Sequence, residues 1–128
     1  TLTGAVVVAL GHHASGLVGV PSAWVDTVRR AADTTGEQVW PLPALDAYAT
    51  QLKSETADLA NIGGRAAGAI TAAMFLKAFS GELPWAHLDI AGTAWYEMAT
   101  PSHAKGASGV GVRLLTELPF ALARDADG

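Results

Sequence analysis

The sequence predicts a layered α/β fold, in which helices cover the faces of a β-sheet. Segments with the pattern of strands alternate with segments with the pattern of helices along the 128 residues. The composition agrees, because 50% of the residues are hydrophobic and 16% are charged, as in globular domains. A chain of this length is expected to form one unit, residues 1–128, around a single core.

The first twenty residues contain one ambiguous segment and one predicted strand. Residues 1–10, TLTGAVVVAL, are compatible with a buried strand or with a short helix, because Gly4 interrupts the valine-rich run. Residues 12–20 alternate loosely between apolar and small residues and end before Pro21, which predicts a strand.

The clearest helix of the sequence follows this strand. Ser22 is placed to cap its start and Gly36 to end it. Its apolar residues recur at helical spacing and predict one buried face: Trp24, Val25, Val28, Ala31 and Ala32. The two prolines of residues 39–43, VWPLP, then favour an extended segment, and residues 44–52 suggest a short helix.

The middle of the chain predicts a helix packed closely against its neighbours. Gly63 and Gly64 allow backbone conformations that other residues avoid. Residues 66–79 are apolar on nearly every face, which predicts a buried helix. Because most of its first residues are glycine or alanine, a neighbouring element can approach it closely.

The last third of the chain predicts one strand and one helix. Residues 85–92, WAHLDIAG, have the composition of a buried strand that ends in glycine. Residues 105–118 form a loop that leads into the last helix, which Pro119 is expected to kink or end. Residues 125–128 are expected to fray.

Charge and composition exclude several classes of partner. A net charge of -4 and a pI near 5.4 provide no positive field for nucleic acid or anionic lipid. The longest apolar run, residues 66–76, is too short to span a bilayer. The absence of cysteine excludes disulfides and thiolate metal sites, and it fits a cytoplasmic location.

No complete catalytic motif is present in the sequence. Gly63 and Gly64 are not followed by the lysine and hydroxyl of a phosphate loop, and no HExxH or GxSxG pattern occurs. His87 and Asp89 would share one side of a strand, where an imidazole and a carboxylate could bind a metal ion. We favour the alternative that both are buried and hydrogen-bonded to backbone. An N-terminal Thr1 acting as a nucleophile remains an alternative.

Three stretches resemble the C-terminal half of the catalytic domain of leucyl aminopeptidases, also called cytosol aminopeptidases. They are TLTGA at residues 1–5, KSETADLANIGGRAAGAITAAMFLKAF at residues 53–79 and PWAHLDIAGTAW at residues 84–95. The resemblance extends from Thr1 to about Leu118. It implies a three-layer α/β/α mixed sheet flanked by helices, of which this chain is the C-terminal segment and lacks the upstream part.

The resemblance also implies a metal-dependent exopeptidase that removes N-terminal residues, leucine among the favoured ones, from peptides. In this family two divalent ions, manganese, zinc or magnesium, activate a water molecule. The family's ligands lie in an upstream block resembling Asn-Thr-Asp-Ala-Glu-Gly-Arg-Leu, which this sequence lacks. We therefore expect no catalytic residue and no metal ligand in this chain, which alone would be inactive.

What the resemblance assigns to this chain is part of the pocket wall. The family's N-terminal loop binds the peptide through its backbone, a second loop borders the pocket for the residue after the cleaved bond, and two small residues line the pocket for the N-terminal side chain. The matching substrate-binding residues are Thr1, Leu2 and Gly4, then Ile62, then Ala91 and Ala94. The alternative is that these alanines only pack.

The resemblance implies a homohexamer, whose partners are peptide substrates, the upstream segment and copies of the same chain. Residues 61–65 would then form a loop at the pocket edge and at a subunit contact, in which we expect Arg65 to make an ion pair. We expect His12, His13 and His103 at the surface. As a fragment, the chain should also expose apolar surface. A non-catalytic binding or assembly module with the same fold remains the alternative function.

Overall fold

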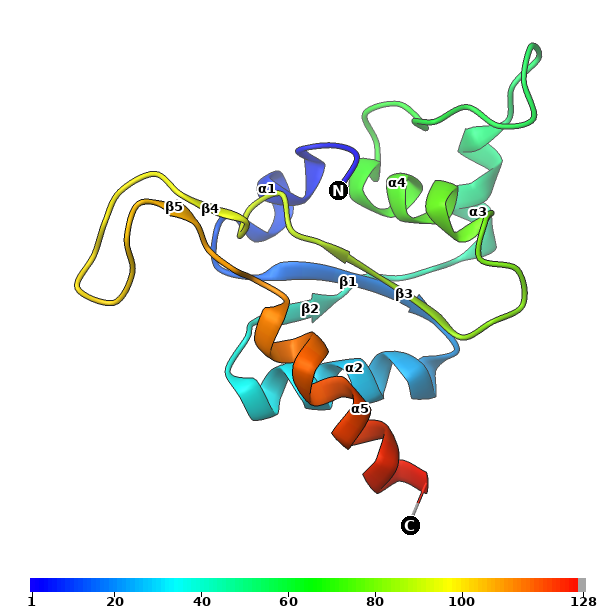
Figure 1. Cartoon of the computed structure of the whole chain (residues 1–128). Helices are drawn as coiled ribbons and strands as arrows, with labels where there is room; N and C mark the ends of the chain where they lie inside the picture. The colour runs from blue at the N-terminus through cyan, green and yellow to red at the C-terminus, as the bar shows by residue number, and fades with distance from the viewer. Residues whose placement is uncertain (127–128) are drawn as a thin grey trace.

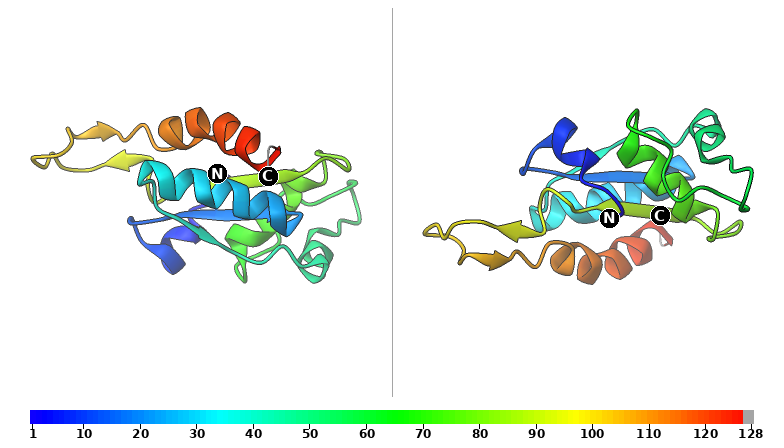
Figure 2. Two further views of the ribbon diagram at one scale, coloured as in Figure 1. Left: turned by 90° about the horizontal axis from the view of Figure 1, so that it is seen from below. Right: turned by 90° about the horizontal axis from the view of Figure 1, so that it is seen from above.

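A mixed three-stranded sheet forms the middle layer of the structure, a computed structural model that describes residues 1–126 (Figure 1). Strand β1 (Ser15–Val20) lies in the centre, parallel to β2 (Val39–Pro41) and antiparallel to β3 (Trp85–Asp89). Helices cover both faces of this sheet (Figure 2). The predicted α/β/α class and the two predicted strands are therefore confirmed, and the segment predicted as extended contains β2.

One face of the sheet is covered by α2 (Ser22–Thr35) and α5 (Val112–Ala126) (Figure 1). The apolar stripe predicted for α2 faces the sheet. The buried core between these layers consists of Leu17, Val28, Ala32 and Leu114. Large aliphatic side chains thus fill this interface, and their burial is the main source of its stability.

The opposite face is covered by α1 (Ala5–Leu10), α3 (Asp46–Ala49) and α4 (Gly68–Lys77), with a 3-10 turn, η1 (Thr50–Leu52), after α3. Residues 5–10 are therefore a helix, which decides the ambiguity left by the sequence. The small residues of α4 permit the close approach that we predicted. A Cβ added at Gly68 would lie 2.9 Å from the Cβ of Ala5.

Two expectations about helix ends are wrong. Ser22 is the first residue of α2 and its side chain makes no capping hydrogen bond, because the preceding residue, Pro21, occupies the cap position. Pro119 was expected to kink or to end the last helix, and the second of these is wrong, because α5 continues to Ala126. The predicted stop of α2 is correct, since Gly36 adopts a left-handed conformation with φ of 73°.

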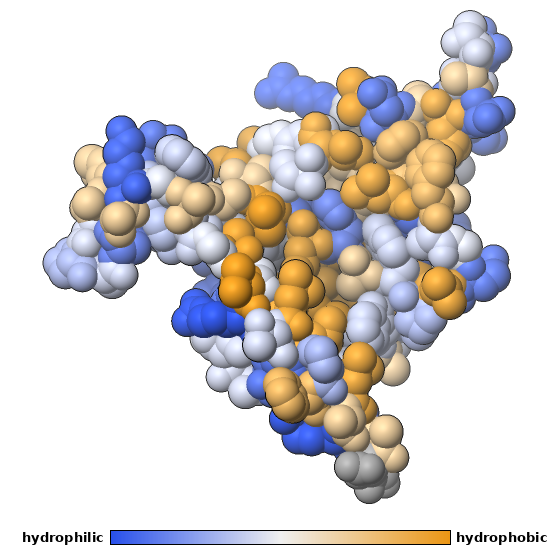
Figure 3. Space-filling model, in the orientation of Figure 1, coloured by the Kyte–Doolittle hydropathy of each residue, from blue (hydrophilic) through white to orange (hydrophobic). Residues whose placement is uncertain are grey.

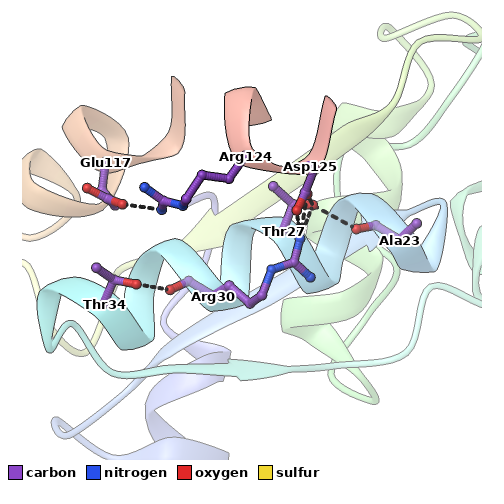
Figure 4. A network of polar contacts seen from close by, with 7 residues as sticks. All are labelled: Ala23, Thr27, Arg30, Thr34, Glu117, Arg124 and Asp125. Carbon is purple, nitrogen blue, oxygen red and sulfur yellow. Dashed lines mark hydrogen bonds and ion pairs between the residues drawn. The ribbon is translucent and has the colours of Figure 1, made fainter. Parts of the chain in front are cut away.

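Contacts near both ends hold α5 on α2, which explains why α5 continues past Pro119. At the start of α5, Glu37 accepts hydrogen bonds from the backbone N–H groups of Gly111 and Arg113. Near its end, Asp125 accepts a hydrogen bond of 2.6 Å from the hydroxyl of Thr27 and pairs with Arg30 (Figure 4). The fraying expected from residue 125 is therefore wrong for Asp125, while residues 127–128 lie outside the described residues.

A two-stranded ribbon projects from the body of the molecule between β3 and α5 (Figures 1 and 2). It contains β4 (Trp95–Tyr96) and β5 (Gly106–Ala107), which pair antiparallel. The sequence predicted a loop at β5 and no element at β4. Stacking of Tyr96 on His103, with ring centroids 3.5 Å apart, stabilises the ribbon.

The helices found within residues 1–126 do not include one with the length and apolar character needed to span a bilayer.

Candidate functional site

The N-terminal loop is bound to the end of β3 by a buried carboxylate. The hydroxyl of Thr1 donates to Oδ1 of Asp89 at 2.7 Å, and the N–H of Ile90 donates to the Thr1 hydroxyl at 3.0 Å. The N–H of Ala91 donates to the same Asp89 oxygen at 3.2 Å. Asp89 is 1% exposed. It therefore brings two of the six predicted peptide-binding residues, Thr1 and Ala91, next to each other.

A tight turn after β3 carries both predicted pocket alanines. The N–H of Ala94 donates to the carbonyl of Ile90 at 2.9 Å, so the chain reverses between the two alanines. Ala94 is half-buried. Asp89 joins this turn to the N-terminal loop, because it accepts hydrogen bonds from Ala91 and from Thr1.

The remaining loop residues are exposed and present different groups. Leu2 is 45% exposed. The carbonyl of Gly4 accepts a hydrogen bond from the N–H of Val7 at 3.1 Å.

Ile62 lies in a different loop, between η1 and α4, and is 55% exposed. Within residues 1–126, no hydrogen bond joins Ile62 to the N-terminal loop or to the alanine turn. Gly64 has a φ of 92°, a left-handed conformation of the kind that the sequence suggested. Gly63 is needed for a different reason, because a side chain there would not fit against its neighbours. A Cβ at Gly63 would lie 2.9 Å from Cγ2 of Thr71 in α4. The glycines thus hold this loop against α4.

Arg65 does not form the ion pair that we expected. Its side chain is exposed, and the ion pairs found within residues 1–126 do not include it. The loop around it lies at the surface, where water solvates the guanidinium group without a carboxylate partner.

His87 is buried beside Asp89, but its hydrogen bonding differs from the expectation. Asp89 Oδ1 accepts a backbone N–H, as predicted, whereas Asp89 Oδ2 and His87 Nε2 are buried without a partner among residues 1–126. Burial lowers the pKa of His87 below its usual value of 6.5. The positive amino terminus lowers this pKa further and Asp89 opposes both effects. The imidazole is therefore held in its neutral form.

The described residues do not fit a two-metal centre. Within residues 1–126, no cluster of three or more histidine, cysteine, aspartate or glutamate side chains could hold a metal ion. His12 and His13 are exposed, as expected, and lie in a turn before β1 instead of in the predicted strand. His103 is half-buried rather than on the surface, because it stacks on Tyr96.

Comparison with known proteins decides the family. The model of the cytosol aminopeptidase family, catalytic domain, matches residues 1–116. This chain belongs to that family. Two similar curated relatives are probable cytosol aminopeptidases from Geobacter sp. (strain M21), 57% identical over 117 residues, and from Solibacter usitatus (strain Ellin6076), 57% identical over 118 residues.

These cytosol aminopeptidases are longer than the chain. The match covers 91% of the chain but 24% of the Geobacter protein, and 92% of the chain but 25% of the Solibacter protein. The chain thus spans about a quarter of the length of these relatives.

Solved structures of the same kind have the same fold. The bottromycin maturation enzyme BotP superposes with a TM-score of 0.87 at 35% identity, over 95% of this chain and 28% of that chain. A tomato leucine aminopeptidase mutant superposes with a TM-score of 0.81 at 39% identity, over 91% of this chain and 22% of that chain. The arrangement around Asp89 therefore belongs to an aminopeptidase fold.

Two buried acidic residues make contacts that the sequence did not predict. Asp89 lies in a segment predicted as a buried strand, but no local pattern connects it to Thr1, 88 residues earlier in the chain. Glu37, which is 7% exposed, belongs to no motif of the sequence. The signal that could have found Glu37 is an acidic residue directly between the glycine that ends a helix and an extended segment.

Proposed function

We propose that this chain is the C-terminal segment of the catalytic domain of an aminopeptidase, and that it builds part of the peptide-binding wall. The observation that carries this proposal is the hydrogen bonding of Asp89, which joins the N-terminal loop to the alanine turn. This chain belongs to the cytosol aminopeptidase family, whose resemblance assigned the N-terminal loop and the alanine turn to one pocket. Asp89 holds these two segments together.

The proposed reaction is removal of the N-terminal residue from a peptide, with leucine among the favoured residues. The complete enzyme would use two divalent ions, manganese, zinc or magnesium, which supply an activated water when bound. One structural relative is described as BotP in complex with Mn. Because residues 1–126 contain no suitable ligand cluster, groups outside this chain would hold the ions.

The role of this chain is to bind and to select the peptide. Small side chains at Ala91 and Ala94 leave space for a leucine-sized group, and a pocket of this kind discriminates by about 1–3 kcal/mol per methylene. The backbone of Leu2 and Gly4 provides polar groups that can pair with the backbone of a substrate. Ile62 offers an exposed apolar contact for the residue after the cleaved bond.

Exposed apolar surface supports the proposal that further polypeptide covers this chain. Figure 3 shows such surface over α5 and over the helices on the opposite side of the sheet. On α5 it includes Val112, Leu115 and Phe120, which are 58% to 64% exposed. Within residues 1–126, β3 pairs with β1 along one edge and with no strand along the other. Both features fit docking of the upstream segment and assembly into a cytoplasmic homohexamer.

A chimera tests the proposed function. The 128-residue chain would replace the matching segment of the Geobacter sp. (strain M21) relative, and hydrolysis of a leucine anilide would be assayed with added manganese. We expect activity from the chimera and none from the chain alone. Activity of the chain alone would show that its own groups hold the metal. A folded but inactive chimera would favour the non-catalytic module.

The same chimera tests the role of Thr1 and the role of Ala94. Thr1 is internal there and has no free amine, so an active chimera excludes an N-terminal threonine nucleophile. Ala94→Leu should lower the preference for leucine over alanine substrates by about tenfold or more, since added methylenes fill the pocket. The control Ala94→Ser, which keeps the size, should leave this preference nearly unchanged. Equal preference in both variants would contradict the assignment of Ala94 to the pocket.

A further inference from the structure

A cavity with polar walls lies beside the projecting ribbon. Its volume is about 470 Å³, which is within the usual range for small-molecule sites. Four segments meet there: the turn after α1, the connection from α2 to β2, the ribbon, and the start of α5. None of the six predicted peptide-binding residues lines it. Its titratable and charged residues are His12, His13, Glu37, Tyr96, His103 and Arg113.

The carboxylate in this wall already has its partners. Glu37 accepts the N–H of Gly111 at 2.8 Å through one oxygen and the N–H of Arg113 at 3.2 Å through the other. Nε of Arg113 lies 3.6 Å from the second oxygen. The negative charge of Glu37 is therefore balanced by Arg113 and by the backbone donors at the start of α5. The start of α5 and Arg113 thus already bind one oxyanion group, the carboxylate of Glu37.

Several hydrogen-bond donors around the cavity remain available. The guanidinium of Arg113 carries five N–H groups, and its side chain is 68% exposed, so contact through Nε leaves the terminal nitrogens for another partner. Ser108 Oγ accepts the N–H of Val110 at 3.1 Å, which leaves its own proton to donate. Arg113 and Ser108 can therefore donate hydrogen bonds to a ligand, whereas the Glu37 carboxylate can only accept them.

His103 also lines the cavity, and its ring is held in place by stacking on Tyr96. Its Nδ1 is buried away from the open space, so contact with a ligand in the cavity would use Nε2. On the opposite wall, His12 Nδ1 lies 2.9 Å from the carbonyl of Gly92, which fixes the ring and leaves Nε2 for a second partner.

We propose that this cavity binds a small oxyanion, phosphate or carboxylate. The planar fork of an arginine matches both of these groups, and hydroxyl and imidazole donors complete their coordination. A metal ion is disfavoured, because these histidines and Glu37 do not form a three-ligand cluster within the described part of the chain. The proposal depends on the cavity alone and does not rest on the aminopeptidase assignment.

The test is a titration of the ¹⁵N-labelled 128-residue chain with sulfate, phosphate and acetate at constant ionic strength. We expect saturable shifts of the backbone signals of Gly109, Arg113 and His103. Saturation by sulfate and phosphate alone would identify the ligand as a tetrahedral oxyanion, and saturation by acetate as well would include carboxylates. Shifts that rise linearly with all three salts would overturn the proposal.

Variants localise the binding. Arg113→Gln should weaken sulfate binding at least about tenfold, as expected for loss of a charged hydrogen bond. His103→Phe keeps an aromatic ring against Tyr96 but removes the nitrogen, and it should weaken binding several-fold. Arg29→Gln, an exposed residue of α2 outside the cavity, is the charge-matched control and should bind as the native chain does. Equal affinity in His103→Phe and the native chain would contradict the site, even if Arg113→Gln failed to fold.

Discussion

Both faces of the sheet bury apolar side chains, but they differ in what else they carry. Towards α2 and α5, leucine, valine and alanine side chains form a continuous core that includes Leu17, Val28 and Leu114. Towards α1 and α4, large side chains such as Val6 and Met74 are buried as well, and Gly68 packs closely against Ala5. That second face also carries the buried polar residues His87 and Asp89 and the exposed side chains of Leu2 and Ile62.

The difference separates a mainly apolar contact from one that also contains close backbone approaches and buried polar groups. Large buried side chains provide apolar burial on both faces. On the α1 and α4 face, small residues let backbone segments approach each other, and a buried carboxylate fixes the N-terminal loop. Backbone groups placed in this way suit recognition of a peptide. Substitutions should therefore affect the two faces differently.

The largest loss of stability is expected from Leu114→Ala in the core of the α2 and α5 face. Leu114 is fully buried, so truncation should leave a cavity and lower the free energy of unfolding by about 2–5 kcal/mol. Ile62→Ala, on the exposed loop, should change it by less than about 0.5 kcal/mol. Urea denaturation measures both, and equal effects would contradict the division between the faces.

Glu37→Gln should lower the free energy of unfolding by about 1.5–3 kcal/mol, because charged hydrogen bonds to the start of α5 are lost. Glu55→Gln, in an exposed loop, is the matched control. Amide hydrogen exchange should accelerate most at Gly111 and Arg113, whose N–H groups donate to Glu37. Unchanged exchange there would show that Glu37 does not hold this end of the helix.

Gly68→Val tests the close contact on the other face. Its Cβ would be forced to within 2.9 Å of the Ala5 Cβ, and overpacking of this kind costs about 1–3 kcal/mol. Adding Ala5→Gly should recover part of the loss, since it removes the opposing methyl group. A double variant no more stable than Gly68→Val would show that the strain lies elsewhere. Thermal unfolding of the three proteins gives the comparison.

His87 makes the stability of the α1 and α4 face sensitive to mild acid. Because burial lowers the pKa of His87 in the folded protein, the unfolded chain binds protons more readily. The free energy of unfolding should therefore fall as the pH drops below the usual histidine value of 6.5. In His87→Gln this part of the pH dependence should disappear. An identical slope in both proteins, measured by urea denaturation, would exclude His87 as its source.

The smallest effect is expected from the contact that joins α2 to the end of α5. The Thr27 hydroxyl, followed by Arg30, lowers the pKa of Asp125 below its ordinary value of 3.8. The contact therefore stabilises the fold above this value and weakens as the pH falls through the lowered pKa. Asp125→Asn should remove this acid dependence and change stability at neutral pH only slightly, because the carboxylate is exposed. Nuclear magnetic resonance titration of Asp125 provides the direct measurement.

Short-range pattern was sufficient to predict much of the fold. The stripe of α2 repeats with the period of a helix, and Gly36 has the backbone freedom that its end requires. Residues 85–89 and 68–77 were likewise predicted as strand and helix, with ends displaced by a few residues. Local periodicity failed at residues 5–10, since a short apolar run fits either a strand or a helix. The local rule for proline failed at Pro119, where long-range contacts keep α5 helical.

The sequence by itself determined the α/β class and the family, because periodicity and motifs depend on neighbouring positions. The six residues expected to contact a peptide stay a prediction. The tertiary structure decided which distant groups meet. Asp89 reaches Thr1 across 88 residues and Glu37 reaches Gly111 across 74. The cavity beside the ribbon likewise needs four separate segments. Such contacts depend on how the layers pack, and packing is a property of the whole chain that local sequence patterns do not contain.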